Sequence, residues 1–224
     1  MSIVRYDNEY STVNGTGWTP ILTYPSDGRP IRSVRKIRVY NPNAGTIQAE
    51  AAFWDGSARA ILAPALTIGA GSLGSGNGIR IYPFCLVAPG EELQLRLDAT
   101  YGSAAIVTCP YIEASGVGGT TWRHKIVDVG TSAAWIEVVA VTEADPTIRL
   151  RSYHNHDSSW TGSIYTDIYD GSTSRMVDSI ISDAAHYHER YNDIQIANLG
   201  ESLRLKASSA PTDLTVVALY EVYR

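Results

Sequence analysis

Two stretches decide the fold: PGEELQLRL at residues 89–97 and LGESLRLKA at residues 199–207. Each has a glycine followed by a glutamate, and then apolar residues at every second position. A period of two places the leucines on one face of a β-strand and the polar residues on the other face. Both stretches therefore predict a half-buried strand that begins directly after a turn.

Two further pairs of stretches precede these in the same order. FWDGS at residues 53–57 matches IYDGS at residues 168–172, and IRVY at residues 37–40 matches IRL at residues 148–150. From the earliest pair to the latest, the separations are 111, 115 and 110 residues. A nearly constant separation indicates that one small β module has been duplicated.

The rest of the chain favours strands as well. Short runs rich in Val, Ile, Thr and Tyr alternate with Asp-Gly, Pro-Gly and Asn-Pro turn signals, and no stretch has a convincing helical stripe. We predict an all-β protein of two tandem duplicated antiparallel β-sandwich modules, jelly-roll-like in character. The expected boundaries are a polar arm at residues 1–16, module 1 at 17–114, a glycine-rich linker at 115–119 and module 2 at 120–224.

Composition excludes several classes of function. A net charge of −5 and a pI near 5.5 argue against a general nucleic-acid binder. There is no run of 18 apolar residues for a membrane span, and the first residues lack the apolar core of a secretory signal. We therefore expect synthesis in a cytoplasm, where Cys85 and Cys109 stay as buried thiols.

Four histidines are the candidate metal ligands. They form two His-x-His pairs, both in the second module, and residues i and i+2 of a strand point to the same side. If the two segments are neighbours, four imidazoles converge on a transition metal, the one cofactor that the sequence suggests; the alternative is exposed or hydrogen-bonded histidines. The four residues are His154, His156, His186 and His188.

The duplicated carboxylates argue against catalysis. Asp55 and Asp170 each precede a glycine in what we interpret as a turn, and Glu91 and Glu201 each follow a turn glycine. No Gly-x-Ser-x-Gly motif is present. The glycine-rich residues 68–78 lack the lysine of a phosphate-binding loop, so we expect a surface loop there. The sequence predicts that the protein is not an enzyme.

Aromatic and basic residues suggest contact surfaces. Fourteen tyrosines suit surfaces that meet proteins or sugars. Trp18 and Trp122 open their modules at comparable positions and are predicted to be core, whereas Trp135 has no obvious counterpart. Core packing is expected for Trp160, and the alternative is an exposed glycan or partner contact at Trp160, Tyr165 and Asp167. A cluster of basic residues is either the wet face of a strand or a patch for an acidic partner: Arg29, Arg32, Arg35, Lys36 and Arg38.

The last two predicted strands carry a resemblance. GESLRLKASS at residues 200–209, followed by LTVVALYEV at 214–222, resembles the closing hairpin of small β-sandwich accessory virion proteins of tailed bacteriophages. In that family a strand starting Gly-(Asp or Glu) precedes a last strand that ends in tyrosine or glutamate. The resemblance implies a structural role with no shared catalytic residues, and assembly from a pool in the host cytoplasm.

We therefore expect a bacteriophage virion structural protein, located in the virion. The first hypothesis is an accessory capsid component of the decoration or cement type, or a fibre-base component. Its partners would be other virion proteins of the shell or fibre, and the protein would be a homo-oligomer in the particle, without nucleic acid or membrane. Alternatives are a glycan-binding host-recognition module and a double-barrel major capsid protein.

Overall fold

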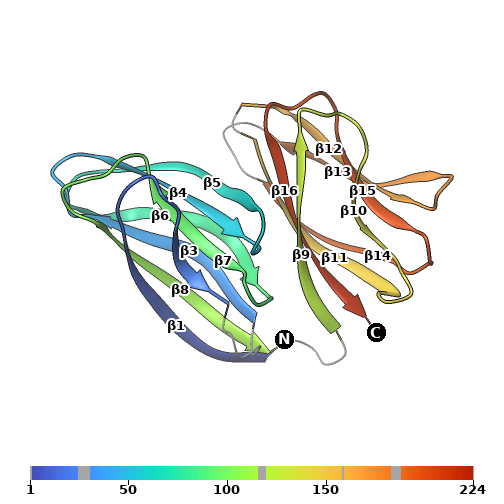
Figure 1. Ribbon diagram of the computed structural model, residues 1–224, viewed down its shortest axis with the longest axis horizontal. Coiled ribbons are helices and arrows are strands. Elements are labelled where there is room, and N and C mark those ends of the chain that lie inside the picture. Colours follow the sequence, from blue (N-terminus) through green and yellow to red (C-terminus); the bar gives the residue numbers. More distant parts are fainter. Residues whose placement is uncertain (1, 25–30, 116–119, 158, 183–187, 224) are drawn as a thin grey trace. The chain divides into compact units, whose positions relative to one another are not determined.

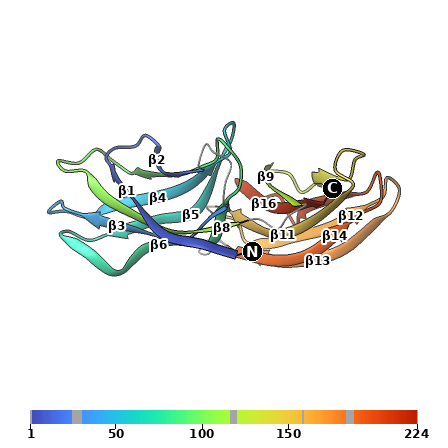
Figure 2. The ribbon, with the colours of Figure 1, turned by 90° about the horizontal axis from the view of Figure 1, so that it is seen from below.

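The computed structural model describes residues 2–24, 31–115, 120–157, 159–182 and 188–223. The chain divides into two compact units, Met1–Gly116 and Val117–Arg224. The described residues form sixteen β-strands, eight in each unit (Figure 1, Figure 2). Of the predicted linker, Ser115 ends a strand, and residues 116–119 lie outside the described residues. None of the described segments is a helix that could cross a membrane.

Unit 1 consists of two four-stranded antiparallel sheets. Their strand orders are β1-β8-β3-β6 and β2-β7-β4-β5. The strands are β1 (Ser2–Val13), β2 (Thr19–Thr23), β3 (Ile31–Asn41), β4 (Ile47–Trp54), β5 (Arg59–Ile68), β6 (Ser72–Leu86), β7 (Glu92–Leu97) and β8 (Ala105–Ser115).

Unit 2 repeats this arrangement in its own two sheets. Their orders are β14-β11-β16-β9 and β10-β15-β12-β13, again antiparallel throughout. The strands are β9 (Thr120–Gly130), β10 (Ile136–Ala140), β11 (Thr147–His156), β12 (Gly162–Tyr169), β13 (Ser174–Ser182), β14 (His188–Ile196), β15 (Ser202–Ala207) and β16 (Leu214–Tyr223).

The two units have the same topology. Adding eight to each strand number of unit 1 gives the strand orders of unit 2. Eight antiparallel strands in two sheets, with the first strand beside the last and the second beside the seventh, form a jelly roll. The predicted all-β fold of two tandem jelly-roll-like modules is confirmed.

The residues predicted to be an N-terminal arm form a strand. Ser2–Val13 make β1, which pairs with β8 from Ser2 opposite Ser115 to Val13 opposite Ala105. The polar composition suggested an arm because few of these residues enter the core. An edge strand tolerates this composition, since charged side chains on an edge also discourage pairing with foreign strands.

The glycine-rich segment also differs from its prediction. Gly71, with a φ of 57°, lies in the turn between β5 and β6, and the backbone of residues 72–78 already belongs to β6. Ser72 pairs with Asn41 and Gly78 with Arg38 across an irregular register. Glycine weakens a strand interior, but β6 is an edge strand with register shifts, where glycines are tolerated.

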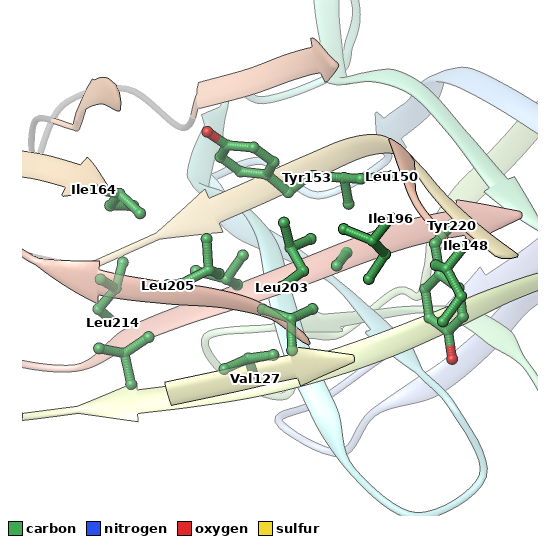
Figure 3. Close-up of a cluster of buried hydrophobic side chains, with 14 of the residues drawn as sticks. Val127, Ile148, Leu150, Tyr153, Ile164, Ile196, Leu203, Leu205, Leu214 and Tyr220 are labelled. Carbon is green, nitrogen blue, oxygen red and sulfur yellow. The ribbon is translucent and has the colours of Figure 1, made fainter. Parts of the chain in front are cut away.

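The core of unit 2 shows why the period-two pattern predicted its strands. Leu203 and Leu205 of β15 are 2% and 1% exposed. The residues that alternate with them in the same strand, Arg204 and Lys206, are only half-buried. The leucines pack with Ile148 and other apolar side chains of the facing sheet (Figure 3). The leucines of β7 in unit 1 are buried in the same way.

Candidate interaction surface

The duplicated Asp-Gly stretches are turns in both units. Asp55 Oδ1 accepts hydrogen bonds from the backbone N–H groups of Ser57 (2.8 Å) and Ala58 (2.7 Å). Asp170 Oδ1 accepts equivalent bonds from the N–H groups of residues 172 (3.0 Å) and 173 (2.7 Å). These backbone donors lower the pKa of Asp170 to about 2. The glycines that follow have φ values of 97° and 91°, so the turn interpretation is confirmed.

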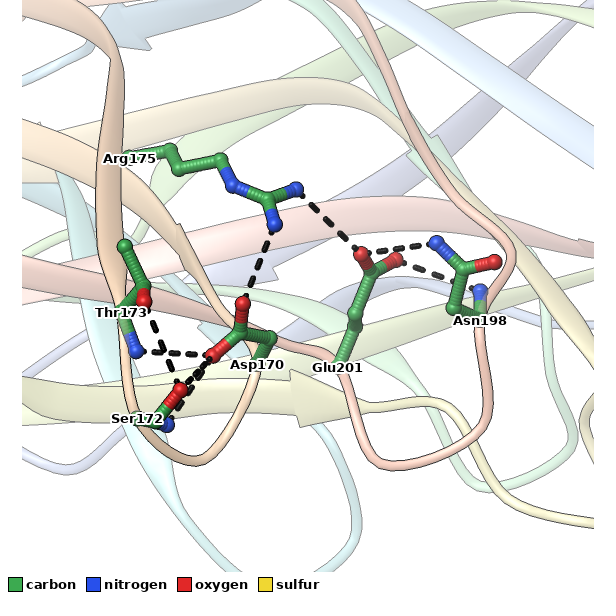
Figure 4. Close-up of polar contacts among 6 residues, drawn as sticks. All are labelled: Asp170, Ser172, Thr173, Arg175, Asn198 and Glu201. Atoms are coloured by element: carbon green, nitrogen blue, oxygen red, sulfur yellow. Dashed lines mark hydrogen bonds and ion pairs between the residues drawn. The ribbon is translucent and has the colours of Figure 1, made fainter.

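The duplicated glutamates hold the next turn. Glu91 Oε2 accepts the N–H groups of Val87 (2.7 Å) and residue 88 (3.2 Å). Glu201 accepts the Asn198 side-chain amide at 2.8 Å, and Arg175 bridges Asp170 (3.0 Å) to Glu201 (3.8 Å), as Figure 4 shows. The Asn198 amide is the main reason why the pKa of Glu201 is lowered. These carboxylates are engaged in turn structure rather than presented to a substrate.

The predicted metal ligands lie mostly outside what the structure describes. His186 is outside the described residues, and the side chains of His154 and His188 are too. The strands that carry them are neighbours, since β11 pairs with β14 and Asn155 lies opposite His188. The register thus places His188 directly opposite Asn155, whereas His154 lies opposite Glu189. No group of three metal-ligating side chains occurs among the described residues, and the metal site stays a prediction.

The three residues of the predicted glycan contact do not form an open platform. Trp160 is 7% exposed in the core of unit 2, and its Nε1 donates to Ser209 Oγ at 3.0 Å. Asp167 is fully buried and accepts two bonds from Arg204, at 3.0 and 2.6 Å. Tyr165 is half-buried beside Lys206, whose Nζ lies 5.7 Å from the ring centroid. Trp160 is thus packed in the core, as expected, whereas glycan binding stays a prediction.

Neither cysteine forms a disulfide. Cys109 is fully buried, and burial raises the pKa of its thiol to about 12, with the charge of Glu9 adding to the effect. A thiol with this pKa stays protonated and is a poor nucleophile. Cys85 is half-buried.

The most exposed apolar side chains of unit 1 share one sheet face. Tyr6, Tyr10 and Ile106 are 71%, 69% and 47% exposed. Tyr10 lies opposite Thr108, which lies opposite Arg38, and Ile106 lies opposite Tyr40. We call this outward side of β1, β8 and β3 the tyrosine face. Its members are Tyr6, Asn8, Tyr10, Ser33, Lys36, Arg38, Tyr40, Ile106, Thr108, Pro110 and Ile112.

Two adjoining grooves cross the tyrosine face. One, of about 430 Å³, is lined by Tyr6, Lys36 and Tyr111 among others, and the second, of about 750 Å³, by Tyr10 and Ile106. Asn8 and Arg38 line both grooves. Grooves that combine aromatic and cationic side chains are typical of protein-binding surfaces.

The residues of the predicted basic cluster have different roles: some make contacts within unit 1, and others lie on its surface. Arg32 donates to Glu113 at 3.2 Å and to the backbone oxygen of Thr23 at 2.6 Å. It therefore links β3 to β8 and to the end of β2. Lys36 and Arg38 lie on the tyrosine face, and neither forms an ion pair with any residue that the structure describes. Arg29 lies outside the described residues, as does the side chain of Arg35.

The other sheet of each unit presents a different outward face. Trp18 lies under Arg96 (4.5 Å from guanidinium carbon to ring centroid) and Arg59 (5.2 Å). Trp135 lies in the same way under Lys206 (4.8 Å) and Arg204 (5.1 Å). Trp135 is therefore the counterpart of Trp18, and the sequence-based match of Trp18 with Trp122 is wrong. Each of the two rings is half-buried beneath its cations rather than packed in the core.

The sequence carries a signal for the tyrosine face, although composition alone points to an arm. Tyr6, Asn8, Tyr10 and Thr12 alternate with the other residues of β1 at a period of two. Once these residues are recognised as a strand, their alternation predicts an outward face of exposed tyrosines.

Comparisons with known proteins do not identify a family. No protein-family model matches the chain, and no curated protein matches it. Among solved structures, it is similar to the STIV MCP at 9% identity, covering 98% of this chain and 97% of that one, with a TM-score of 0.47. The major capsid protein P2 from Bacteriophage PM2 follows at 12% identity, with 97% and 98% coverage and a TM-score of 0.39.

A third similar structure has a different description. It is the N-terminal CBM22-1-CBM22-2 tandem domain from Paenibacillus barcinonensis Xyn10C, at 11% identity, with 100% and 98% coverage and a TM-score of 0.28. All three TM-scores lie below 0.5, so these likenesses assign neither a fold family nor a function to the chain.

Proposed function

We propose that the protein is a structural component of a virus particle, of the accessory decoration, cement or fibre-base type. The observation that carries the proposal is the pairing of two complete jelly rolls with a tyrosine face on unit 1, which has no counterpart among the described side chains of unit 2. A subunit that acts through contacts needs rigid, closed modules and an exposed aromatic surface. Its place would be the virion, after assembly in the cytoplasm of the host.

The engagement of polar groups supports a structural role over a catalytic one. Asp55, Asp170, Glu91 and Glu201 are bound to turn backbone or turn side chains, and Asp167 is bound to Arg204. The Cys109 thiol is buried and protonated. A catalytic acid or nucleophile needs access to its substrate, and Glu91, Glu201, Asp167 and Cys109 are all buried. The half-buried Asp55 and Asp170 accept the backbone N–H groups of their own turns.

Mass spectrometry of purified particles of the virus that encodes this chain tests the proposal. We expect peptides from both units at a stoichiometry that is fixed relative to the shell protein. Deleting the gene should leave closed shells that are less resistant to heat or shear, because an accessory protein is not needed for closure. Absence of the protein from washed particles would refute the proposal.

One observation favours a second candidate, a double-barrel major capsid protein. Both units are complete jelly rolls of the same strand order in tandem, which is the architecture that this name describes. The gene deletion separates the two candidates. If no shells form without the protein, and if it is the most abundant protein of the particle, the shell role replaces the accessory role.

A further inference from the structure

The two units differ in charge. Residues 1–116 contain nine Lys and Arg and nine Asp and Glu, whereas residues 117–224 contain nine and fourteen. The entire net charge of −5 therefore comes from the second unit. Asp128, Glu143 and Asp213 are among its exposed carboxylates. One chain thus carries a neutral unit and an acidic unit.

The tyrosine face of the neutral unit is complementary to an acidic partner. Lys36 and Arg38 project from it, and its members, defined above, include no carboxylate. Asp7 reaches one groove, where it lies 3.4 Å from Arg5, and Arg5 and Arg32 together balance the charges of Asp7 and Glu113. A positive face that is flanked by exposed tyrosines supplies both the charge attraction and the aromatic anchors of a protein interface.

Charge also argues against the packing of two tyrosine faces on each other. A two-fold dimer of this kind would place Lys36 and Arg38 of one copy against the same residues of the other. Like charges brought together at an interface are costly. A head-to-tail contact between different surfaces avoids this cost, and repeating it generates a ring or a filament.

We propose that the tyrosine face of unit 1 binds the acidic unit 2 of another copy of this chain. The contact is heterologous: each copy offers its positive face to one neighbour and its acidic unit to another. This inference deepens the proposed function, on which it rests, by naming the partner. Dense repetition of a weak contact of this kind is how subunits on a particle cooperate.

Sedimentation velocity on the full chain tests the contact. We expect species larger than the monomer that grow with protein concentration and shrink between low salt and 0.5 M NaCl, because salt screens the attraction. The variant Lys36→Glu/Arg38→Glu should weaken association at least about tenfold. Tyr10→Ser should weaken it about tenfold through loss of the anchor. The control is Lys125→Glu, which makes the same kind of charge change on exposed unit 2 and should leave association intact or stronger.

A mixing experiment separates a head-to-tail contact from a symmetric one. The variant Asp128→Asn/Glu143→Gln/Asp213→Asn reduces the charge of unit 2 from −5 to −2, wherever the contact lies on that unit. This variant and Lys36→Glu/Arg38→Glu should each be monomeric alone and should form a one-to-one dimer when mixed. Far-ultraviolet circular dichroism checks that each variant is folded, and Arg38→Gln is the milder replacement if the double reversal is not.

The results decide between outcomes. Wild-type protein that stays monomeric at low salt and high concentration would overturn the inference, as would association that both variants retain. A monomeric protein that is still found in purified particles would overturn only this inference and leave the proposed function intact. A protein that associates in solution but is absent from purified particles would overturn the proposed function and leave the head-to-tail contact intact.

Discussion

Unit 1 and unit 2 have the same strands and turns, yet they differ at equivalent positions of their second sheets. Where β4 meets β7, Ala52 lies opposite Gln94; where β12 meets β15, Asp167 lies opposite Arg204. Ala52 and Asp167 are both completely buried. One topology therefore accommodates either a small apolar residue or a buried ion pair at the same place. The two units share the period-two leucines and the turns that form the fold. They differ at Ala52 and Asp167, whose side chains lie on the other face of the sheet from the core.

The largest effect should come from a core position that differs between the units. Phe53 of β4 is fully buried, with its ring centroid 5.0 Å from that of Phe84, whereas its counterpart Ile168 is only half-buried. Phe53→Ala should reduce the free energy of unfolding by about 4 kcal/mol, because it leaves a large cavity. Ile168→Ala should cost about half as much. Urea unfolding followed by circular dichroism measures both, and equal losses would contradict the difference in packing.

The buried ion pair of unit 2 should give the next largest effect. Asp167→Ala leaves the Arg204 guanidinium without its carboxylate and should cost about 3 kcal/mol. The double variant Asp167→Ala/Arg204→Gln introduces the residue types of unit 1 and should recover about half of the loss, because no charge is left unpaired.

Thermal unfolding of the single and double variants measures this recovery. Arg204→Gln alone is the control, since it leaves Asp167 buried without its cation and should be strongly destabilising as well. If the double variant is no more stable than Asp167→Ala, the pair is not the reason for the difference between the units.

The sequence predicted the parts of the fold that repeat locally. The leucines of residues 89–97 and 199–207 and the two Asp-Gly turns need only their own period and their own glycines, so they were recognised without tertiary information. The edge strands β1 and β6 could not be recognised in this way. Their polar or glycine-rich residues become strands because β8 and β3 offer hydrogen-bonding partners that are distant in sequence.

The candidate surface was predicted only in part, for the same reason. The sequence alone marks Lys36 and Arg38 as part of a basic cluster, but the tyrosine face also needs β1 at the sheet edge. Sequence position alone matches Trp18 with Trp122, because both come early in their units. The registers show instead that Trp18 and Trp135 each lie one residue before the second strand of a unit.

A smaller effect should come from the cation-covered tryptophans, which the two units share. Trp18→Ala should reduce the free energy of unfolding by about 2 kcal/mol, because it removes the contacts with Arg96 and Arg59. Trp135→Ala should have a similar effect, because two cations lie over this ring as well. Chemical denaturation of both variants tests the equivalence. Trp160→Ala, in the core, is the contrast and should cost about 4 kcal/mol.

The smallest effect should be an acid sensitivity that is greater in unit 2 than in unit 1. Asp157 accepts four backbone N–H bonds, from Ser159, Trp160, Thr212 and Asp213, at 2.8 to 3.0 Å. Burial raises the pKa of Asp157, but the four donors lower it by more, so its pKa lies below the ordinary value. The neutral amides Asn41 and Asn43 make the loop contacts at the corresponding end of unit 1.

A carboxyl group whose pKa is lower in the folded state stabilises the fold at pH values above its unfolded pKa, which is about 3.9 for Asp. That contribution is lost as the pH falls through the folded value. We therefore expect both units to lose stability below about pH 4, because Asp55 in unit 1 and Asp170 in unit 2 both have lowered pKa values. Asp157, with four backbone donors against the single backbone donor of Asp98 in unit 1, should make the loss larger in unit 2. Amide hydrogen exchange at pH 5 and pH 3, corrected for intrinsic rates, reports the two units separately. Protection should fall more in β12 and β16 than in β4 and β8, and in Asp157→Asn the two units should respond more nearly alike. An equal loss in both units of the wild-type protein would show that amide and carboxylate serve this loop equally well at low pH.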